Sequence, residues 1–164
     1  MSLRKTSFAP IVADDTRLLI LGSLPGAKSL AAGEYYAHPQ NRFWHLVERV
    51  TGAPLVSLTY KERIETLLRH QIGLWDAVRS AEREGSLDAA MRAIESTDLP
   101  LLVSRLPELQ AVAFNGRKSE AIGRPQLDDM SVETIALPSS SPAHAAMTFA
   151  QKAEEWDKLQ QFLR

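Results

Sequence analysis

Residues 22–44 read GSLPGAKSLAAGEYYAHPQNRFW, and this stretch follows a short apolar run at residues 17–21. A continuous apolar run of this length is typical of a strand that is buried on both faces of a parallel sheet. The loop after it combines glycine and proline turns with two tyrosines and the sequence His-Pro-Gln-Asn, an unusual composition for a plain connection. The stretch therefore indicates a buried strand whose end carries a functional loop.

Strand and helix patterns alternate along the rest of the chain. Two further strands are predicted at residues 111–114 and 132–137, each of which ends in a turn sequence. Apolar residues at helical spacing predict helices at residues 39–50, 61–70, 99–106 and 149–163. Strands that alternate with helices imply an α/β fold with a parallel sheet covered on both faces. The length suits one domain over residues 1–164.

Three segments carry weaker signals. Residues 1–13 have no helical period and are expected to be an extended lead-in, and residues 72–76 form another short apolar segment. Residues 80–96 are charged and small, which predicts a surface helix or loop.

Three unusual loops each follow a predicted strand. They are the glycine loop (residues 22–26), the asparagine loop (residues 115–116) and the serine loop (residues 138–142). Right-handed crossovers place the carboxyl ends of parallel strands at one edge of a sheet, and ligands bind outside that edge. We therefore expect these three loops to meet in space.

The composition excludes several kinds of chemistry. The chain has no cysteine, so it has neither a disulfide nor a thiolate nucleophile, and its four histidines show no paired ligand spacing. We expect no metal and no cofactor. No apolar run approaches the roughly 20 residues that span a bilayer, and no signal peptide precedes the fold, so we expect a soluble cytoplasmic protein. The net charge of −1 gives no global sign of nucleic-acid binding, but phosphate contacts depend on local patches.

The glycine loop and the tyrosines after it have both a structural and a functional interpretation. Backbone amides in a glycine turn can approach an anion closely, although most such turns are only turns. Tyr35 and Tyr36 lie in a loop beside the expected site. We expect one ring to fill the core and the other to stack on a planar ligand.

Asn41 is expected in the first turn of a helix that begins at Pro39. Its side chain there can satisfy a free backbone N–H group, or its carbonyl oxygen can orient a water molecule. Both interpretations stay open from spacing alone.

The serine loop, Pro138 to Pro142, is rigid at its two prolines and carries hydroxyl groups between them. Such a loop can bind phosphates through hydroxyls and amides, or it can be a solvated turn, and His144 alone is typical of a surface or N-cap residue. A candidate phosphate-facing rim lies next to the three loops in sequence and consists of Arg42, Arg49, Arg117, Lys118 and Arg124.

Four segments taken together resemble the uracil-DNA glycosylase superfamily: LGSLPG, YYAHPQNRFW, AFNGRKS and LPSSSPAH, in this order. The chain is most similar to the deoxyinosine (hypoxanthine)-DNA glycosylase branch, over roughly residues 18–144. The resemblance implies a three-layer α/β/α sandwich around a short, mainly parallel four-stranded sheet. It also implies a monofunctional enzyme that flips a deaminated base, with hypoxanthine as the expected base, out of double-stranded DNA and cleaves its N-glycosidic bond with water. The expected protein is a monomer without metal, associated with the nucleoid if bacterial.

The resemblance also implies roles for individual residues. The backbone of Gly22, Ser23 and Leu24 corresponds to the segment that reads the base edge, Tyr36 to the ring that stacks on the flipped base, and Asn115 to a residue that lines the base pocket. The loop that enters the minor groove corresponds here to Ser139, Ser140, Ser141, Pro142 and His144, with Lys118 as a further DNA contact.

The main departure from related branches is at Leu24. The mismatch-specific branch carries there an asparagine that positions the attacking water, and leucine cannot do so. In the deoxyinosine branch this duty passes to an asparagine that matches Asn41, so Asn41 is the expected catalytic residue. Two alternatives remain: a mismatch-specific uracil/thymine-DNA glycosylase, and a non-catalytic domain that binds a nucleobase or nucleic acid.

Overall fold

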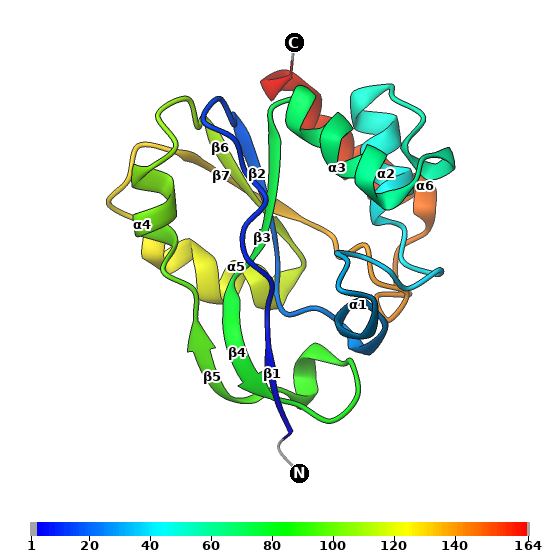
Figure 1. The fold of residues 1–164 in the computed structure, drawn as a ribbon, viewed down its shortest axis with the longest axis vertical. Helices are drawn as coiled ribbons and strands as arrows, with labels where there is room; N and C mark the ends of the chain where they lie inside the picture. The colour runs from blue at the N-terminus through cyan, green and yellow to red at the C-terminus, as the bar shows by residue number, and fades with distance from the viewer. Residues whose placement is uncertain (1–2, 164) are drawn as a thin grey trace.

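A four-stranded parallel sheet runs through the middle of the molecule in the computed structural model, which describes residues 3–163 (Figure 1). Its spatial order is β3-β2-β6-β7, and every neighbouring pair is parallel. The strands are β3 (Ile72–Asp76), β2 (Leu18–Gly22), β6 (Ala111–Asn115) and β7 (Glu133–Leu137). The chain leaves β2 to one side for β3 and later crosses to β6 on the other side, so the topological switch point lies between β2 and β6.

Helices cover both faces of this sheet, which confirms the expected three-layer architecture (Figure 1). One face carries α2 (Phe43–Thr51), α3 (Tyr60–Arg69) and α6 (Phe149–Trp156), and the other carries α4 (Leu99–Ser104) and α5 (Arg117–Gly123). The short helix α1 (Ala27–Ala32) follows the glycine loop. Short 3₁₀ helices complete the fold: η1 (Leu55–Ser57), η2 (Asp88–Ala90), η3 (Arg124–Leu127) and η4 (Asp157–Phe162).

The central strand β2 shows why its sequence is continuously apolar. All five of its residues are buried, and alternate side chains enter two separate cores. Leu18 and Ile20 pack with α2, α3 and α6, whereas Leu19 and Leu21 pack with α4. Because both faces of the strand are covered, no position along it tolerates a polar residue, and the prediction of a buried strand is confirmed.

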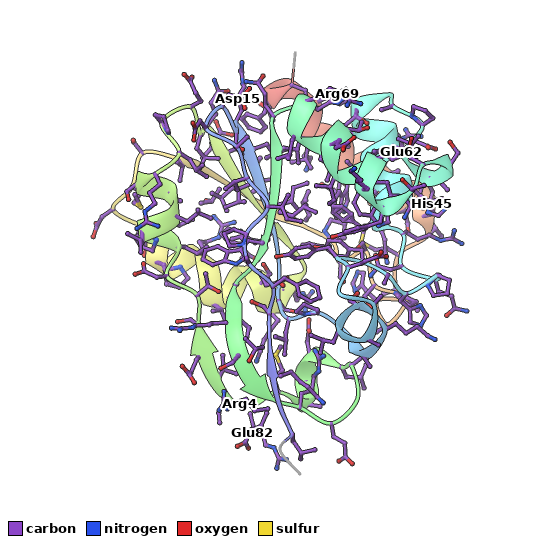
Figure 2. All side chains as sticks on the ribbon, in the orientation of Figure 1. Arg4, Asp15, His45, Glu62, Arg69 and Glu82 are labelled. Carbon is purple, nitrogen blue, oxygen red and sulfur yellow. The ribbon has the colours of Figure 1, made fainter. Side chains whose placement is uncertain are left out.

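A second, antiparallel sheet was not predicted. Its order is β1-β4-β5, formed by β1 (Arg4–Thr6), β4 (Val78–Glu82) and β5 (Arg92–Ser96). Arg4 and Glu82 are register partners near the end of this sheet that is remote from the helices (Figure 2). The prediction of a surface helix or loop over residues 80–96 is therefore wrong for residues 80–82 and 92–96, which are strand, whereas residues 83–91 form a connection with one short 3₁₀ turn. Every residue of β5 is exposed, so the strand lacks the apolar alternation by which strands are recognised.

The helix that follows the tyrosines begins later than predicted. α2 starts at Phe43, not at Pro39, and residues 38–41 form a turn in which the Asn41 backbone N–H donates to the carbonyl of His38 over 3.0 Å. The Asn41 side chain accepts a hydrogen bond from the Phe43 N–H over 2.9 Å. Asparagine competes with helical hydrogen bonding in this way, which explains why the helix begins only beyond it.

Candidate active site

A cavity of about 1000 Å³ opens at the carboxyl ends of the parallel strands. The glycine, asparagine and serine loops all line it, which confirms that the three loops meet in space. Their contributions extend over residues 22–29, 115–118 and 136–144. Residues 86–89, from the connection between β4 and β5, form a further wall that the sequence did not predict. The site lies where the topology of an open α/β sheet places ligands.

Both tyrosines line the cavity, but Tyr35 is buried in the main core whereas Tyr36 is only partly buried. Tyr35 is 3% exposed, and its hydroxyl donates to the carbonyl of Ala9 over 3.1 Å. Tyr36 lines the cavity and stacks on Phe43, with ring centroids 3.9 Å apart and planes 8° apart. Since Phe43 covers one face of the Tyr36 ring, only its other face is available to a ligand.

The backbone of Tyr36 has φ +56°, a region that side chains other than glycine rarely adopt. Such strain persists only where the surroundings fix the conformation, and it is enriched at functional sites. Burial, and next the nearby Asp76 carboxylate, raise the pKa of Tyr36 above its usual value. Its hydroxyl therefore stays protonated and serves as a hydrogen-bonding group of the cavity.

Asn41 lines the same cavity as Tyr36. Its carbonyl oxygen accepts from the Phe43 N–H, so the structural interpretation of this residue is realised. A carbonyl oxygen has two lone pairs, and the second is free in principle to accept from a water molecule. The hydrogen bond to Phe43 is therefore observed, whereas the water-orienting role of Asn41 stays a prediction.

Ser140 joins the loops to each other. The Asn115 amide donates to the Ser140 hydroxyl over 2.9 Å and accepts from the Ser140 backbone N–H over 2.9 Å. The Arg42 N–H, at the start of α2, donates to the Ser140 carbonyl over 3.0 Å. Because Ser140 is 1% exposed, its hydroxyl faces Asn115 rather than solvent, which differs from the direct phosphate contact expected of it. Asn115 lines the cavity and also holds the serine loop in place.

The remaining predicted residues of the serine loop, Ser139, Ser141, Pro142 and His144, line the cavity and are at least partly exposed. Helix α6 fixes this loop through two residues that the sequence did not point to. The Lys152 ammonium donates to the Ser141 carbonyl over 3.3 Å, and the Trp156 indole donates to the Pro138 carbonyl over 2.9 Å. Lys152 is 5% exposed, and this burial lowers its pKa.

The predicted basic rim is smaller than expected. Arg117 and Lys118 line the cavity, as does Lys28, which the sequence did not single out. By contrast, Arg49 pairs with Asp157 over 3.0 Å and Arg124 with Glu120 over 2.9 Å. These two arginines have local partners on the helices, and Arg42 also lies outside the cavity lining.

The glycine loop is held from the side of the second sheet. The Ser23 hydroxyl donates to Asp88 over 2.6 Å, and the Leu24 side chain, 6% exposed, packs in a small cluster with β4. Arg83 is 1% exposed, and its guanidinium donates to the carbonyl of Pro25. The backbone of residues 22–24 is therefore fixed in position along the cavity wall, whereas the Leu24 side chain is engaged in packing.

Asp76 was missed by the sequence analysis. It ends β3, lines the cavity and is 3% exposed. Burial, and next the nearby Asp88, raise the pKa of Asp76 to about 8, which the charge of Arg83 partly offsets. The available signal was a carboxylate directly after the apolar residues 72–75, at the same position as Gly22 and Asn115 on their strands.

Within residues 3–163, no group of three or more metal-ligating side chains is placed to hold an ion. No helix in this range is long and apolar enough to cross a membrane.

Residues 9–164 match the family described as the uracil DNA glycosylase superfamily, and the chain belongs to this superfamily. It is 39% identical to a hypoxanthine DNA glycosylase of Methanosarcina barkeri over 151 residues, which cover 92% of this chain and 95% of the relative. It is 37% identical to a hypoxanthine DNA glycosylase of Methanosarcina acetivorans over 153 residues, or 93% and 96% of the two chains. These matches confirm the family predicted from the four sequence segments.

A solved structure gives the same fold. The solution NMR structure of a Methanosarcina acetivorans protein, described as a candidate uracil DNA glycosylase, superimposes with a TM-score of 0.87 at 36% identity. The superposition covers 96% of this chain and 97% of the other, so the similarity extends over nearly the whole of both chains.

Proposed function

We propose that this protein is a monofunctional DNA N-glycosylase that hydrolyses the bond between hypoxanthine and deoxyribose in double-stranded DNA. The proposal is supported by the names of the two relatives that match it over nearly their full lengths. The structural observation that carries it is that Tyr36 and Asn41 line one cavity at the switch point of the sheet. A stacking ring and a group able to orient water are the two elements that base removal requires.

The substrate base must leave the duplex to react. Its glycosidic carbon is inaccessible in the stack, so the nucleotide is flipped into the cavity at the cost of a few kcal/mol. The uncovered face of Tyr36 stacks on the base, an interaction worth about 1–3 kcal/mol. Phe43 behind the ring fixes its orientation.

Hydrolysis uses a water molecule held against the sugar carbon. The Asn41 carbonyl oxygen orients this water but is no general base, because an amide has no useful basicity near neutral pH. As the C1′–N9 bond breaks, negative charge develops on the base and positive charge on the sugar. Backbone N–H groups of the glycine loop stabilise the leaving base, in the manner of an oxyanion hole. The water oxygen forms the new C1′–O bond and its proton passes to solvent, while the departing base anion takes up a proton, so the products are an abasic site and free hypoxanthine.

The rim of the cavity supplies the residues that bind the DNA backbone. The exposed parts of the serine loop lie beside Arg117 and Lys118, and they contact the backbone of the flipped strand. We propose that the protein acts as a monomer on double-stranded DNA that contains a deaminated base. Such an enzyme works where the chromosome is, so we also propose a cytoplasmic location, associated with the nucleoid if the source is bacterial.

The test is base release from duplex oligonucleotides that carry hypoxanthine, uracil or xanthine opposite each normal base, read as strand scission after alkali. We expect hypoxanthine to be released fastest. Faster release of uracil would favour the mismatch-specific alternative. Binding without scission of any duplex would favour the non-catalytic alternative.

A further inference from the structure

Helix α6 donates hydrogen bonds to two backbone carbonyl groups of the serine loop. The Trp156 indole donates to the Pro138 carbonyl over 2.9 Å, and the Lys152 ammonium donates to the Ser141 carbonyl over 3.3 Å. Both donors come from buried residues, since Trp156 is 0% and Lys152 5% exposed. The negative ends of these two peptide groups are therefore engaged by the interior of the protein and are not left to repel an anion at the loop.

Two hydroxyl groups of the same loop keep a donor for a ligand. The Ser139 hydroxyl accepts from the Ser141 N–H over 3.1 Å, and the Ser141 hydroxyl accepts from the Ala143 N–H over 3.2 Å. Neither hydroxyl donates a hydrogen bond to another group among residues 3–163, and both residues line the cavity. Because phosphate oxygens accept from hydroxyl groups, this loop presents two donors that suit an anion.

The Lys152 ammonium is a buried charge without a counter-ion in the protein. None of the ion pairs between residues 3–163 includes it. Glu155, one helical turn further along the chain, pairs with Lys158 instead. A buried ammonium is normally paired, because desolvation strongly disfavours an isolated charge. The retention of a lysine at this position therefore indicates an anion that arrives with the ligand.

The substrate of the proposed reaction supplies such an anion. Each nucleotide of a DNA strand carries one negatively charged phosphate, so phosphates flank the nucleotide that enters the cavity. The serine loop lines that cavity together with Arg117 and Lys118. A phosphate at this loop would be bound by the loop hydroxyls and attracted by the ammonium that the Ser141 carbonyl holds.

We propose that Lys152 is a positioning residue whose buried ammonium holds the serine loop through the Ser141 carbonyl and takes as its counter-ion a phosphate of the strand that carries the flipped nucleotide. This inference rests on the proposed glycosylase function. The hydroxyl groups of Ser139 and Ser141 contact the phosphate, and Lys152 acts on it through the loop. A buried charge acts in a lower effective dielectric than an exposed one, so its attraction for the phosphate is stronger at equal distance.

Two neutral variants test the charge. Lys152→Gln carries an uncharged donor, and Lys152→Met removes both donor and charge. Single-turnover release of hypoxanthine at increasing enzyme concentration gives a half-saturating concentration and a maximal rate. We expect both variants to raise the half-saturating concentration about tenfold, because each loses one charge–charge attraction. The maximal rate should stay within about threefold, as for a group that binds substrate and transition state alike. Lys61→Met, an exposed lysine outside the cavity lining, is the matched control.

Thermal unfolding separates this role from a purely structural one. Lys152→Met should unfold at the temperature of the wild type or above it, because an apolar side chain replaces a buried charge without a partner. The Ser141 carbonyl keeps the hydrogen bond from the His144 N–H in both variants. Weaker binding in a variant at least as stable as the wild type supports the proposal. A lower melting temperature in both variants, or a Gln variant that binds like the wild type, overturns it.

Changes in the DNA test the counter-ion itself. The slope of log K against log salt should become shallower in Lys152→Gln by up to about 0.9, the value for one phosphate contact. Uncharged methylphosphonate can replace the phosphates on either side of hypoxanthine one at a time. At one position it should weaken binding by the wild type more than by Lys152→Gln, because both changes remove the same attraction. Equal losses in the two proteins at every position overturn the proposal.

The two proposals can fail separately. A wild type that binds the duplex but releases no hypoxanthine rejects the proposed function. An active wild type whose neutral variants bind the duplex equally well rejects only the role of Lys152.

Discussion

The two sheets of this protein differ in how they bury their strands and in what they contribute to the cavity. The parallel sheet is enclosed by helices, and its central strands β2 and β6 are buried throughout. The antiparallel sheet has one strand, β5, that is exposed along its whole length. The ends of the parallel strands carry the glycine, asparagine and serine loops. The connection between β4 and β5 of the antiparallel sheet instead braces the glycine loop, through Arg83 and Asp88.

We infer that the parallel sheet carries the loops that act on the substrate, whereas the antiparallel sheet supports one of those loops. Substitutions at the ends of the parallel strands should change activity strongly, because those loops contact the substrate. Substitutions in the antiparallel sheet should act first on stability and only indirectly on activity, because they change how firmly the glycine loop is held. The following substitutions test that separation, in order of decreasing expected effect.

Asn41→Ala should lower kcat about 10²–10³-fold, the usual effect of removing one group that acts in the transition state. It should also cost about 1 kcal/mol of stability, because the Phe43 N–H loses its acceptor. Asn41→Ser retains an acceptor near that N–H but is too short to hold the water, so it should lose activity with little loss of stability. Single-turnover kinetics and thermal unfolding separate the two effects. Activity within tenfold of the wild type in both variants would contradict the role of Asn41.

Tyr36→Ala should reduce kcat/KM by roughly 5- to 150-fold, which corresponds to about 1–3 kcal/mol of lost stacking. Tyr36→Phe keeps the ring on Phe43 and should retain most of the activity. The measurement is base release from a hypoxanthine duplex at subsaturating enzyme. Equal losses in the two variants would show that the hydroxyl, rather than the ring face, is what the reaction needs.

Arg83→Met should destabilise the protein by about 1–2 kcal/mol, because the buried Pro25 carbonyl loses its donor. The expected loss of activity is only severalfold, because Arg83 lies outside the cavity lining. Arg79→Met, at an exposed position of the preceding strand β4, is the matched control and should change neither quantity. Thermal unfolding and kinetics together test the brace. A large loss of activity without loss of stability would place the antiparallel sheet in the chemistry.

Lys118→Ala should weaken DNA binding and reduce the slope of log K against log salt by about 0.9, the change expected for one lost phosphate contact. Lys61→Ala, an exposed lysine on α3 outside the cavity lining, should leave the slope unchanged. Fluorescence anisotropy with a labelled duplex at several salt concentrations measures both. An unchanged slope in Lys118→Ala would remove this residue from the proposed phosphate contacts.

The parallel sheet could be predicted because burial on both faces leaves a clear pattern. The run at residues 17–21 and the run at 111–114 are apolar at every position except Arg17, and both coincide closely with β2 and β6. The β5 strand could not be predicted in the same way. Its residues face solvent, and it is a strand only because β4 lies beside it. An exposed strand can pair through its backbone without burying its side chains, so its sequence shows no apolar alternation.

The site divides in a similar way. The sequence alone indicated the order of the three loops, because each follows a predicted strand. It also singled out the pair of tyrosines and Asn41, because these residues are unusual in a plain connection. Which tyrosine turns inward is set by the edge contact of Tyr35 with Phe8 and by the stack of Tyr36 on Phe43. The inward direction of Ser140 likewise depends on Asn115, 25 residues away along the chain.

The sequence alone predicted a covered parallel sheet and three convergent loops, because burial and local turn chemistry depend on consecutive residues. Four of its segments resemble the uracil-DNA glycosylase superfamily, to which the chain belongs. Folding in three dimensions settled the rest. It brought Asp76, Tyr36 and Asn115 together in the cavity, and burial there, and next the charge of Asp88, raise the pKa of Asp76, which the charge of Arg83 partly offsets. Desolvation and the distance between charges arise only when remote segments pack together, so no local pattern can encode them.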